Sequence, residues 1–162
     1  MAVSHPRRIV VGMDGSDQAC AALDLAIRLA RPMAAEIVVV FAIPPPTYIG
    51  YGYELVPPQF DVEWRAQVQR ELEQEWCRPL VESGLPHRIL VRDGRPAPVI
   101  AGIADREDAD VVVVGRRGRG GMAELLLGSV SHELTHHCDR PVLLVSGGRP
   151  GRTPRRADGG RG

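Results

Sequence analysis

The sequence contains no lysine, because all 20 of its basic residues are arginine. This absence excludes a Schiff-base lysine, a lysine acetylation switch and the lysine of a Walker P-loop. No apolar run approaches the roughly 18 to 20 residues that a membrane-spanning helix needs, so we expect no membrane partner. The three cysteines, Cys20, Cys77 and Cys138, are widely spaced and never form a CxxC pair. They favour a reducing, cytoplasmic location and give no context for a nucleophilic thiolate.

Aromatic residues are also scarce. They make up 4% of the 162 residues, against 44% hydrophobic residues in all, so the core must consist mainly of Val, Leu, Ile and Ala. The length suits one compact domain, which we place at residues 1–146. Residues 147–162 carry five of the arginines and many glycines, and we expect a disordered basic tail there. Nucleic-acid binding by this tail is not favoured, since charged termini usually serve solubility.

Five short runs rich in Val, Ile and Leu divide the chain. They occupy residues 8–11, 37–41, 88–91, 111–114 and 142–145. The runs are almost continuously apolar rather than alternating, which is the pattern of strands covered on both faces. Helix-like segments separate the runs, and parallel strands joined by helices form right-handed βαβ units. The sequence therefore predicts an α/β fold with a doubly wound parallel sheet.

The segments between the runs predict four helices and one long loop. The expected helices cover residues 17–29, 61–83, 98–108 and 129–138. A Ser16/Asp17 cap begins the first helix, and Trp64 and Trp76 belong to an apolar stripe of the second that is interpreted as core. Residues 44–60 contain five prolines and three tyrosines. They cannot form a helix and are expected to be a loop beside a ligand site.

The most informative stretch is glycine-rich and follows the fourth expected strand. Glycines occupy positions 115, 118, 120 and 121, and Gly128-Ser129 opens the next helix. Glycine lets backbone N–H groups approach a phosphate, and the amide donors and dipole of a helix start favour an anion. Positive charge must come from Arg116, Arg117 or Arg119, of which Arg119 is best placed to fold over a polyphosphate, while the other two can simply be solvated. The stretch predicts a phosphate-binding loop with the Ser129 hydroxyl at the helix cap.

Gly115, Gly118, Gly128 and Ser129 satisfy the spacing G-x2-G-x9-G-[S/T]. With this signature the chain resembles the ATP-binding members of the universal stress protein family. The likeness extends over residues 7–145 and includes the opening strand with its Met-Asp-Gly-Ser end, the segment 94–115 and the segment 140–145. A Walker A loop does not fit because it needs lysine, and a Rossmann G-x-G-x-x-G should follow the first strand rather than the fourth.

The resemblance implies a Rossmann-like fold of the adenine nucleotide alpha hydrolase type, with a five-stranded parallel sheet in the order 3-2-1-4-5 and ATP at the carboxyl ends of the strands. Asp14 would face the ribose or a phosphate-bound Mg²⁺, and Ala42 would line the adenine pocket. The positions that it places near the nucleotide are Gly12, Asp14, Ala42, Gly115, Arg116, Arg117, Gly118, Arg119, Gly120, Gly128, Ser129 and Val130. Family members also pair through the last strand, so residues 142–145 are expected to join two chains in a homodimer.

The expected function is that of a cytoplasmic, ATP-binding regulator in the stress response. Its ATP-bound and ATP-free states would differ in the loops 44–60 and 115–127. An unknown protein partner would recognise that difference. A slow ATPase that acts as a timer is one alternative, although the sequence shows no general base and no catalytic residue is predicted. A nucleotide-free dimeric scaffold is another. The sequence does not name the stress, and it does not separate ATP from ADP or AMP.

A competing motif lies in the last expected helix, where His132-Glu133-Leu134-Thr135-His136 reads H-E-x-x-H. On a helix this motif puts two imidazoles on one face for Zn²⁺ and supplies a glutamate as general base. A catalytic zinc needs a third protein ligand, and no glutamate follows His136. Helical geometry groups Val130, Leu134, His137 and Cys138 on one side and leaves His132, Glu133 and His136 on the opposite, solvated side. A zinc peptidase is therefore not expected, while simple binding of Zn²⁺ or Ni²⁺ by the two histidines remains open.

Overall fold

The computed structural model of the chain describes residues 7–45, 62–119 and 127–147. Its elements are β1 (Arg8–Gly12), α1 (Asp17–Met33), β2 (Glu36–Ile43), α2 (Val62–Glu71), the π-helical turn η3 (Leu72–Trp76), α3 (Arg78–Ser83), β3 (His87–Asp93), α4 (Pro96–Arg106), β4 (Val111–Gly115), α5 (Ser129–His137) and β5 (Val142–Val145). Most of the predicted 44–60 loop, Gly120 and the tail from residue 148 lie outside the described residues. Within the described ranges, no helix has the length and apolar character to cross a membrane.

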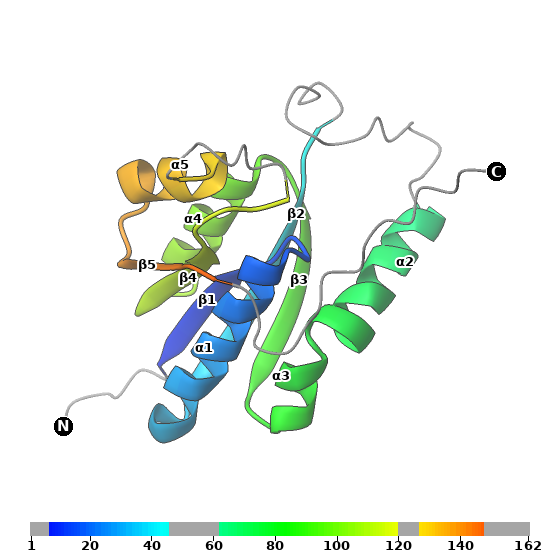
Figure 1. Cartoon of the computed structure of the whole chain (residues 1–162), viewed down its shortest axis with the longest axis horizontal. Helices are drawn as coiled ribbons and strands as arrows, with labels where there is room; N and C mark the ends of the chain where they lie inside the picture. Colours follow the sequence, from blue (N-terminus) through cyan, green and yellow to red (C-terminus); the bar gives the residue numbers. More distant parts are fainter. Residues whose placement is uncertain (1–6, 46–61, 120–126, 148–162) are drawn as a thin grey trace.

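The five strands form one parallel sheet in the order β3-β2-β1-β4-β5 (Figure 1). The central strand β1 pairs on both sides, with Ile9 opposite Ile37 of β2 and Val111 of β4. The chain first builds outward from β1 to β2 and β3, and it then returns to the other side of β1 for β4 and β5. The predicted fold class and strand order are therefore confirmed. The strand order reverses between β1 and β4, which is where sheets of this kind bind ligands.

The two faces of the sheet bury alternate residues of the same strands. Val10, Val38 and Val112 lie side by side and pack against α4 and α5. Ile9 and Ile37 point to the opposite face, which α1, α2, η3 and α3 cover. Figure 1 shows these two helical layers with the sheet between them. Because the central strands are covered on both sides, they need apolar residues at every position, which explains their continuous Val and Ile runs.

The helix predicted over residues 61–83 is interrupted, so that prediction was wrong in its continuity. Cys77 separates η3 from α3, and its backbone has φ −98° and ψ 5°. Pro79 is the physical reason, because proline has no backbone N–H and its ring clashes with the carbonyl four residues earlier. Proline is tolerated in the first helical turn, and α3 accordingly begins at Arg78. The Cys77 N–H donates to the Leu72 carbonyl at 2.7 Å, five residues back, which widens the turn before the break.

Two other helices have ends that differ from the prediction. α1 continues to Met33, four residues past the expected end, and Ala34 stops it in the left-handed conformation with φ 49°. Pro32 lies in this last turn, where its missing N–H removes only one hydrogen bond. α4 begins at Pro96 rather than at residue 98, because the fixed φ of proline suits the first turn of a helix.

Four charged side chains join the amino ends of β1, β2 and β3 to the end of α4. The Glu36 carboxylate lies 3.0 Å from Nε of Arg8 and 2.7 Å from Nε of Arg88. Glu107 lies 2.6 Å from Arg88 and 3.8 Å from Arg8. The hydrogen bonds from Arg88 hold the pKa of both Glu36 and Glu107 below the ordinary value, and those two carboxylates raise the pKa of Arg88. We call these four residues the amino-end network; its two positive and two negative charges balance.

Candidate nucleotide-binding site

Two chain segments meet at the carboxyl ends of β1 and β4. Residues 13–16 connect β1 to α1, and residues 116–119 follow β4. The backbone N–H of Arg119 donates to Oδ2 of Asp14 at 3.2 Å, which joins the two segments directly. The backbone N–H of Arg117 donates to Oε1 of Gln18 at 2.7 Å and ties the loop to the first turn of α1. The described part of the glycine-rich loop is therefore anchored against the β1–α1 turn.

Asp14 lies in a tight turn that its own side chain stabilises. Its Oδ1 accepts the Ser16 N–H at 2.9 Å, and Gly15 between them has φ 76°, a conformation that favours glycine. Ser16 then caps α1, since its Oγ accepts the Ala19 N–H at 3.2 Å, which confirms the predicted cap. Each Asp14 oxygen accepts one N–H, and an ionised carboxylate offers about four acceptor positions. Both oxygens therefore retain capacity for a hydroxyl or a metal ion.

The three glycines of the signature are sites of close approach. A Cβ added at Gly118 would lie 2.5 Å from Oδ2 of Asp14, and one at Gly115 would lie 2.9 Å from Cβ of Gln18. A Cβ at Gly128 would lie 3.3 Å from the backbone of the loop before it. A side chain at any of the three would push apart segments that now touch. The G-x2-G-x9-G spacing thus has a direct packing reason in this fold.

Two other predicted positions, Gly12 and Ala42, lie beside these loops. Gly12 is buried, and a Cβ on it would come within 2.8 Å of the side chains of Ile100 and Val114. This glycine lets β1 pack against α4, so packing alone accounts for it. Ala42 is half-buried on β2, two residues beyond Val40, the partner of Gly12 across the strands. It lies past the end of β1, on the β2 side of the reversal point.

The start of α5 differs from the prediction in one respect. Gly128 is the N-cap residue, and the exposed Ser129 occupies the first helical position without a capping hydrogen bond. Ser131 is the buried hydroxyl instead, with its Oγ 2.7 Å from the Arg116 carbonyl and 3.0 Å from the Gly128 carbonyl. The Gly128 N–H also donates to the Arg116 carbonyl at 2.9 Å. Ser131 therefore fixes the helix start to the end of β4, a contact that the sequence analysis did not predict.

The three arginines of the loop have different surroundings. The Nε atoms of Arg116 and Arg117 are buried, and neither has a hydrogen-bond acceptor among the described residues. Burying such a donor without an acceptor is costly. Arg119 is exposed, and its guanidinium lies 5.0 Å from the centroid of the Trp76 ring, a distance typical of cation–π contact. Positive charge is thus concentrated at the loop, and part of its hydrogen-bonding capacity is unused.

Trp76 and Gln18 are site neighbours that sequence reasoning missed. Trp76 is 6% exposed, stacks near Phe41 with a centroid distance of 5.9 Å, and packs so closely on Gly15 that a Cβ there would lie 2.5 Å from its ring. The apolar stripe of the second helix did indicate core, and Trp76 is core. Its position in η3 also brings its ring to the Asp14 turn, and no pattern in the sequence reveals that.

Neither the thiols nor the H-E-x-x-H motif presents catalytic geometry in the described chain. Burial raises the pKa of the Cys77 thiol to about 12, which keeps it protonated. The Glu133 carboxylate lies 2.8 and 2.9 Å from Nη2 of Arg95, so the general base of the motif is held in an ion pair. His137 is exposed rather than on the buried side, while Leu134 is buried as predicted.

A surface hollow of about 410 Å³ lies apart from the two loops, between the end of β3 and α4. Arg92, Arg95 and Arg106 line it, together with Val99 and Gly102. None of the predicted site residues contributes to it. This hollow is therefore distinct from the junction of the two loops.

The fold and the loop together define a class, namely doubly wound α/β proteins that carry a glycine-rich loop and a helix start at the reversal point of the sheet. The profile of the Universal stress protein family matches residues 5–146, and the chain belongs to that family. It is 32% identical over 146 residues to the universal stress protein YxiE of Bacillus subtilis, covering 85% of this chain and 97% of the relative.

Solved structures show the same fold. The universal stress protein UspA from Lactobacillus plantarum superposes with a TM-score of 0.69 at 18% identity, covering 88% of this chain and 99% of that one. A universal stress protein in complex with cAMP has a TM-score of 0.66 at 26% identity, covering 88% of this chain and 98% of that one.

Proposed function

We propose that this chain binds ATP at the carboxyl ends of β1 and β4 and acts as a nucleotide-dependent regulator in the stress response. The observation that carries the proposal is the junction of the two loops, where Gly118 lies against Asp14 and Gly115 against the first turn of α1. The buried Nε atoms of Arg116 and Arg117 lack acceptors among the described residues. A polyphosphate would supply acceptor oxygens for these two guanidinium groups and negative charge to balance them.

The phosphates would bind the loop backbone and the start of α5. The backbone N–H groups at the first turn of a helix have no intrahelical acceptor, and the helix dipole favours an anion there. In α5 these positions begin with Ser129 and Val130, directly after the Gly128 cap. The exposed Ser129 hydroxyl adds a further donor at the same end. Arg116, Arg117 and Arg119 would neutralise the phosphate charge from the other side.

The nucleoside would extend toward β2, with Asp14 at the ribose or at a phosphate-bound Mg²⁺ and with Ala42 at the adenine. No group of three or more metal-binding side chains occurs in the part of the chain that the structure describes. A Mg²⁺ at Asp14 would therefore take most of its ligands from phosphate and water, as Mg²⁺ commonly does. The residue that the chain itself contributes is one carboxylate with spare acceptor capacity.

A cyclic or simple adenine monophosphate is the second candidate ligand. It is favoured by the 26% identical universal stress protein whose structure contains cAMP. A monophosphate would use the helix start and the glycines but fewer of the arginines. We rank it below ATP because three arginines follow β4 within five residues, which is more positive charge than one phosphate requires.

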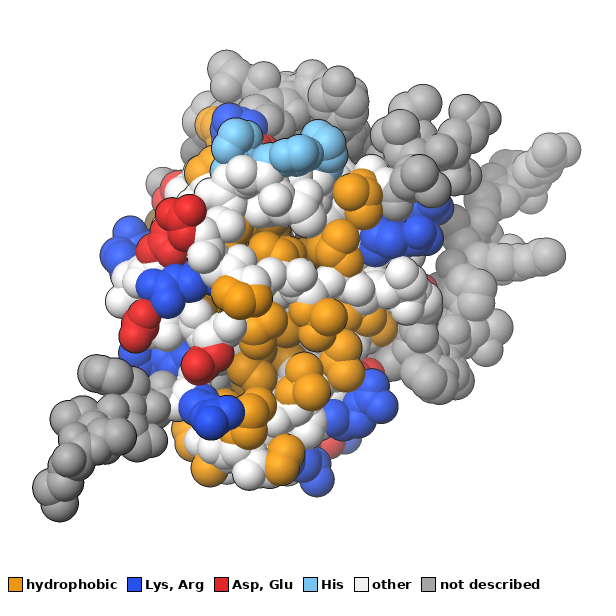
Figure 2. Space-filling view, turned by 90° about the vertical axis from the view of Figure 1, so that its left-hand side faces the viewer, with side chains coloured by type: hydrophobic (Ala, Val, Ile, Leu, Met, Phe, Trp, Pro, Cys, Tyr) orange, Lys and Arg blue, Asp and Glu red, His pale blue; other side chains and the backbone are white. Residues whose placement is uncertain are grey.

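We also propose a homodimer that forms through β5. This strand is the edge of the sheet, and its Leu143 side chain is 37% exposed. Figure 2 faces this edge and shows hydrophobic side chains gathered at its centre with charged residues around them. An open apolar edge is prone to pairing, so a second copy is the natural cover. Sedimentation of the wild-type chain and of Leu143→Arg checks this, with a dimer expected only for the wild type.

The first test of the proposed ligand is to purify the chain without added nucleotide, denature it and identify the released small molecules by chromatography. Calorimetric titration with ATP, ADP, AMP and cAMP, with and without Mg²⁺, then ranks the affinities. We expect ATP to bind most tightly. A chain that releases no nucleotide and takes up none of the four would favour the dimeric scaffold, and steady phosphate release that Asp14→Ala abolishes would favour the slow ATPase.

The matched variant for this test is Gly128→Val. Its Cβ would meet the backbone of the loop at 3.3 Å, so the loop must move away from the helix start. We expect nucleotide affinity to fall by roughly 100-fold while the circular dichroism spectrum stays native. Wild-type affinity in this variant would show that the nucleotide binds elsewhere.

A further inference from the structure

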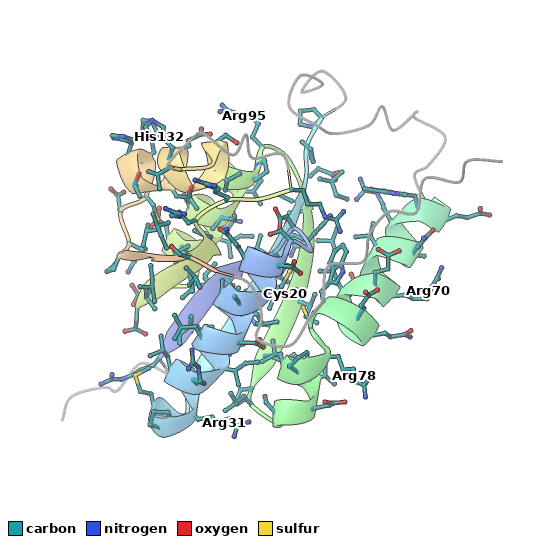
Figure 3. The ribbon with its side chains drawn as sticks, in the orientation of Figure 1. Cys20, Arg31, Arg70, Arg78, Arg95 and His132 are labelled. Atoms are coloured by element: carbon teal, nitrogen blue, oxygen red, sulfur yellow. The ribbon has the colours of Figure 1, made fainter. Side chains whose placement is uncertain are left out.

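The exposed face of α5 carries two histidines that the nucleotide site does not use. His132 and His136 are both exposed, one turn apart, and their ring centroids lie 4.6 Å from each other in an edge-to-face arrangement. Figure 2 shows the histidine side chains as one group at the end of the molecule, and Figure 3 places His132 on the outer side of α5. The ring centroid of His137 lies 6.4 Å from that of His136.

The glutamate between the two histidines is occupied elsewhere. Glu133 makes two contacts with Arg95, at 2.8 and 2.9 Å, so its negative charge is already neutralised. Leu134 points into the core with 1% exposure and holds the helix in place. The outward face of this turn therefore offers two imidazoles on a fixed backbone. It offers no free base beside them.

The spacing of the two rings suits a shared metal ion. A metal with bonds of about 2.0–2.1 Å to two neighbouring imidazole nitrogens holds the ring centroids roughly 4.5 Å apart in the tetragonal geometry of Cu²⁺ and roughly 5 Å apart in the tetrahedral geometry of Zn²⁺. The observed 4.6 Å differs little from these values, so rotation about the side-chain torsions is sufficient and the backbone need not move. Imidazole nitrogen prefers late first-row cations, and affinity rises from Ni²⁺ to Cu²⁺ and falls again at Zn²⁺.

We propose that His132 and His136 form a two-histidine site for a late first-row divalent cation, with Cu²⁺ preferred over Zn²⁺. Water completes the coordination, because the described residues hold no third metal-binding side chain in reach. The site binds metal without hydrolysing a substrate, since the carboxylate of Glu133 beside it is paired with Arg95. Bound metal joins two consecutive turns of α5 and stabilises the folded chain, because the unfolded chain does not hold the two rings together. This inference is independent of the proposed nucleotide site.

The test uses the untagged, full-length chain, titrated with Cu²⁺ and with Zn²⁺ by calorimetry at pH 7.5. We expect one equivalent of Cu²⁺ to bind with a dissociation constant of roughly 10 µM or tighter, and Zn²⁺ to bind more weakly. His132→Ala and His136→Ala should each weaken Cu²⁺ binding by about tenfold or more. Electron paramagnetic resonance of the Cu²⁺ complex should show two equivalent nitrogen ligands in the wild type and one in each variant.

His137→Ala and His87→Ala are the matched controls, because both remove an imidazole outside the pair. Unchanged Cu²⁺ affinity in these controls, with native circular dichroism in every variant, supports the site. Equal losses in His132→Ala and His137→Ala would overturn it in favour of general surface binding. A wild-type dissociation constant weaker than about 1 mM for both metals would overturn it as well.

Discussion

Charged side chains are paired at the amino ends of the strands and only partly paired at the carboxyl ends. At the amino ends, Arg8, Glu36, Arg88 and Glu107 satisfy one another in a balanced network. At the carboxyl ends, Arg116, Arg117 and Arg119 follow β4 with no acidic residue between them. The buried Nε atoms of Arg116 and Arg117 lack acceptors among the described residues. A folded chain gains stability from charges that pair internally and loses it from polar groups that do not. The difference is consistent with an amino end that serves the fold, and it supports the proposal that the carboxyl end serves a ligand.

The two ends of the sheet also differ in their glycines. At the carboxyl ends, a Cβ at Gly115 or Gly118 would lie 2.9 or 2.5 Å from its neighbour, closer than side chains approach, and one at Gly128 would make a tight contact of 3.3 Å. The amino-end network instead consists of long, branched side chains that span three strands. Backbone groups brought close together recognise a phosphate, whereas guanidinium and carboxylate groups recognise each other. Variants that change one end of the sheet alone test whether the two ends have different roles.

The largest effect is expected for Gly118→Val. Its Cβ would lie 2.5 Å from Oδ2 of Asp14, and overpacking of this kind costs about 1–3 kcal/mol when the loop is held in place. Gly118 is exposed, so the free chain relaxes by moving the loop and keeps its stability. Nucleotide binding requires the loop to return, and we expect ATP affinity to fall by ~100-fold.

Calorimetry measures this affinity, and urea unfolding provides the control. A variant that loses both nucleotide affinity and several kcal/mol of stability would show that the carboxyl end also serves the fold. That result would remove the distinction between the two ends. An exposed glycine outside the site, Gly84, gives a reference substitution, although its φ of 70° means that Gly84→Ala carries backbone strain of its own.

The next effect is expected for Arg88→Met at the amino end. The change leaves Glu36 and Glu107 with Arg8 as their shared partner, and the side chains concerned are 21% to 41% exposed. Solvent screens pairs of this kind, so we expect a loss of about 1–2 kcal/mol in the free energy of unfolding by urea. Nucleotide affinity should stay within about twofold of the wild type. A large loss of affinity would show that the two ends are coupled.

Much of the fold, and the position of the candidate site, could be predicted from the sequence for physical reasons. The strand runs 8–11, 37–41 and 111–114 are apolar at each inner position because both faces of the sheet are buried, so strand identity needs no tertiary information. The glycine spacing 115-118-128 follows from packing between fixed elements, and the Ser16 cap follows from local backbone geometry. Local rules therefore sufficed for the strands and for the position of the loop, and the resemblance carried by the glycine motif supplied the strand order.

The rest depends on contacts between distant residues. Gln18 and Trp76 reach the loop only because α1 and η3 pack on the same face of the sheet. Ser131 reaches the Arg116 carbonyl because its place in α5 points it inward, toward the end of β4. The break at Cys77 is the exception, because it is local: Pro79 lies inside the helix expected over residues 61–83, and proline does not fit a helix interior.

A smaller effect is expected for Arg119→Met. The variant removes the cation–π contact with Trp76, which is 5.0 Å away and is worth about 0.5–1 kcal/mol at an exposed site. In a Trp64→Phe background, Trp76 is the only tryptophan, and its emission should change when Arg119 is replaced, even without ligand. ATP affinity should fall by a few-fold, roughly 1 kcal/mol, since one phosphate-facing charge is lost. The exposed pair Arg78–Glu82 supplies the control, because Arg78→Met should change neither emission nor affinity.

The smallest effect is expected from acid on the amino-end network. Hydrogen bonds from Arg88 lower the pKa of Glu36 and Glu107 in the folded chain relative to the ordinary value of 4.5. Their contribution to stability is therefore fully present above about pH 4.5, the unfolded value, and it disappears as the pH falls through the lowered folded values. Urea unfolding between pH 7 and pH 3 should show stability falling across this window, and Glu36→Gln/Glu107→Gln should start lower and fall less. The loop at the carboxyl ends has no such carboxylate pair, so Gly118→Val should keep the wild-type slope. Suppose that Gly118→Val flattened the dependence of the unfolding free energy on pH as much as the double glutamine variant does. The acid dependence would then not come from the amino-end network, and this network would not distinguish the amino end.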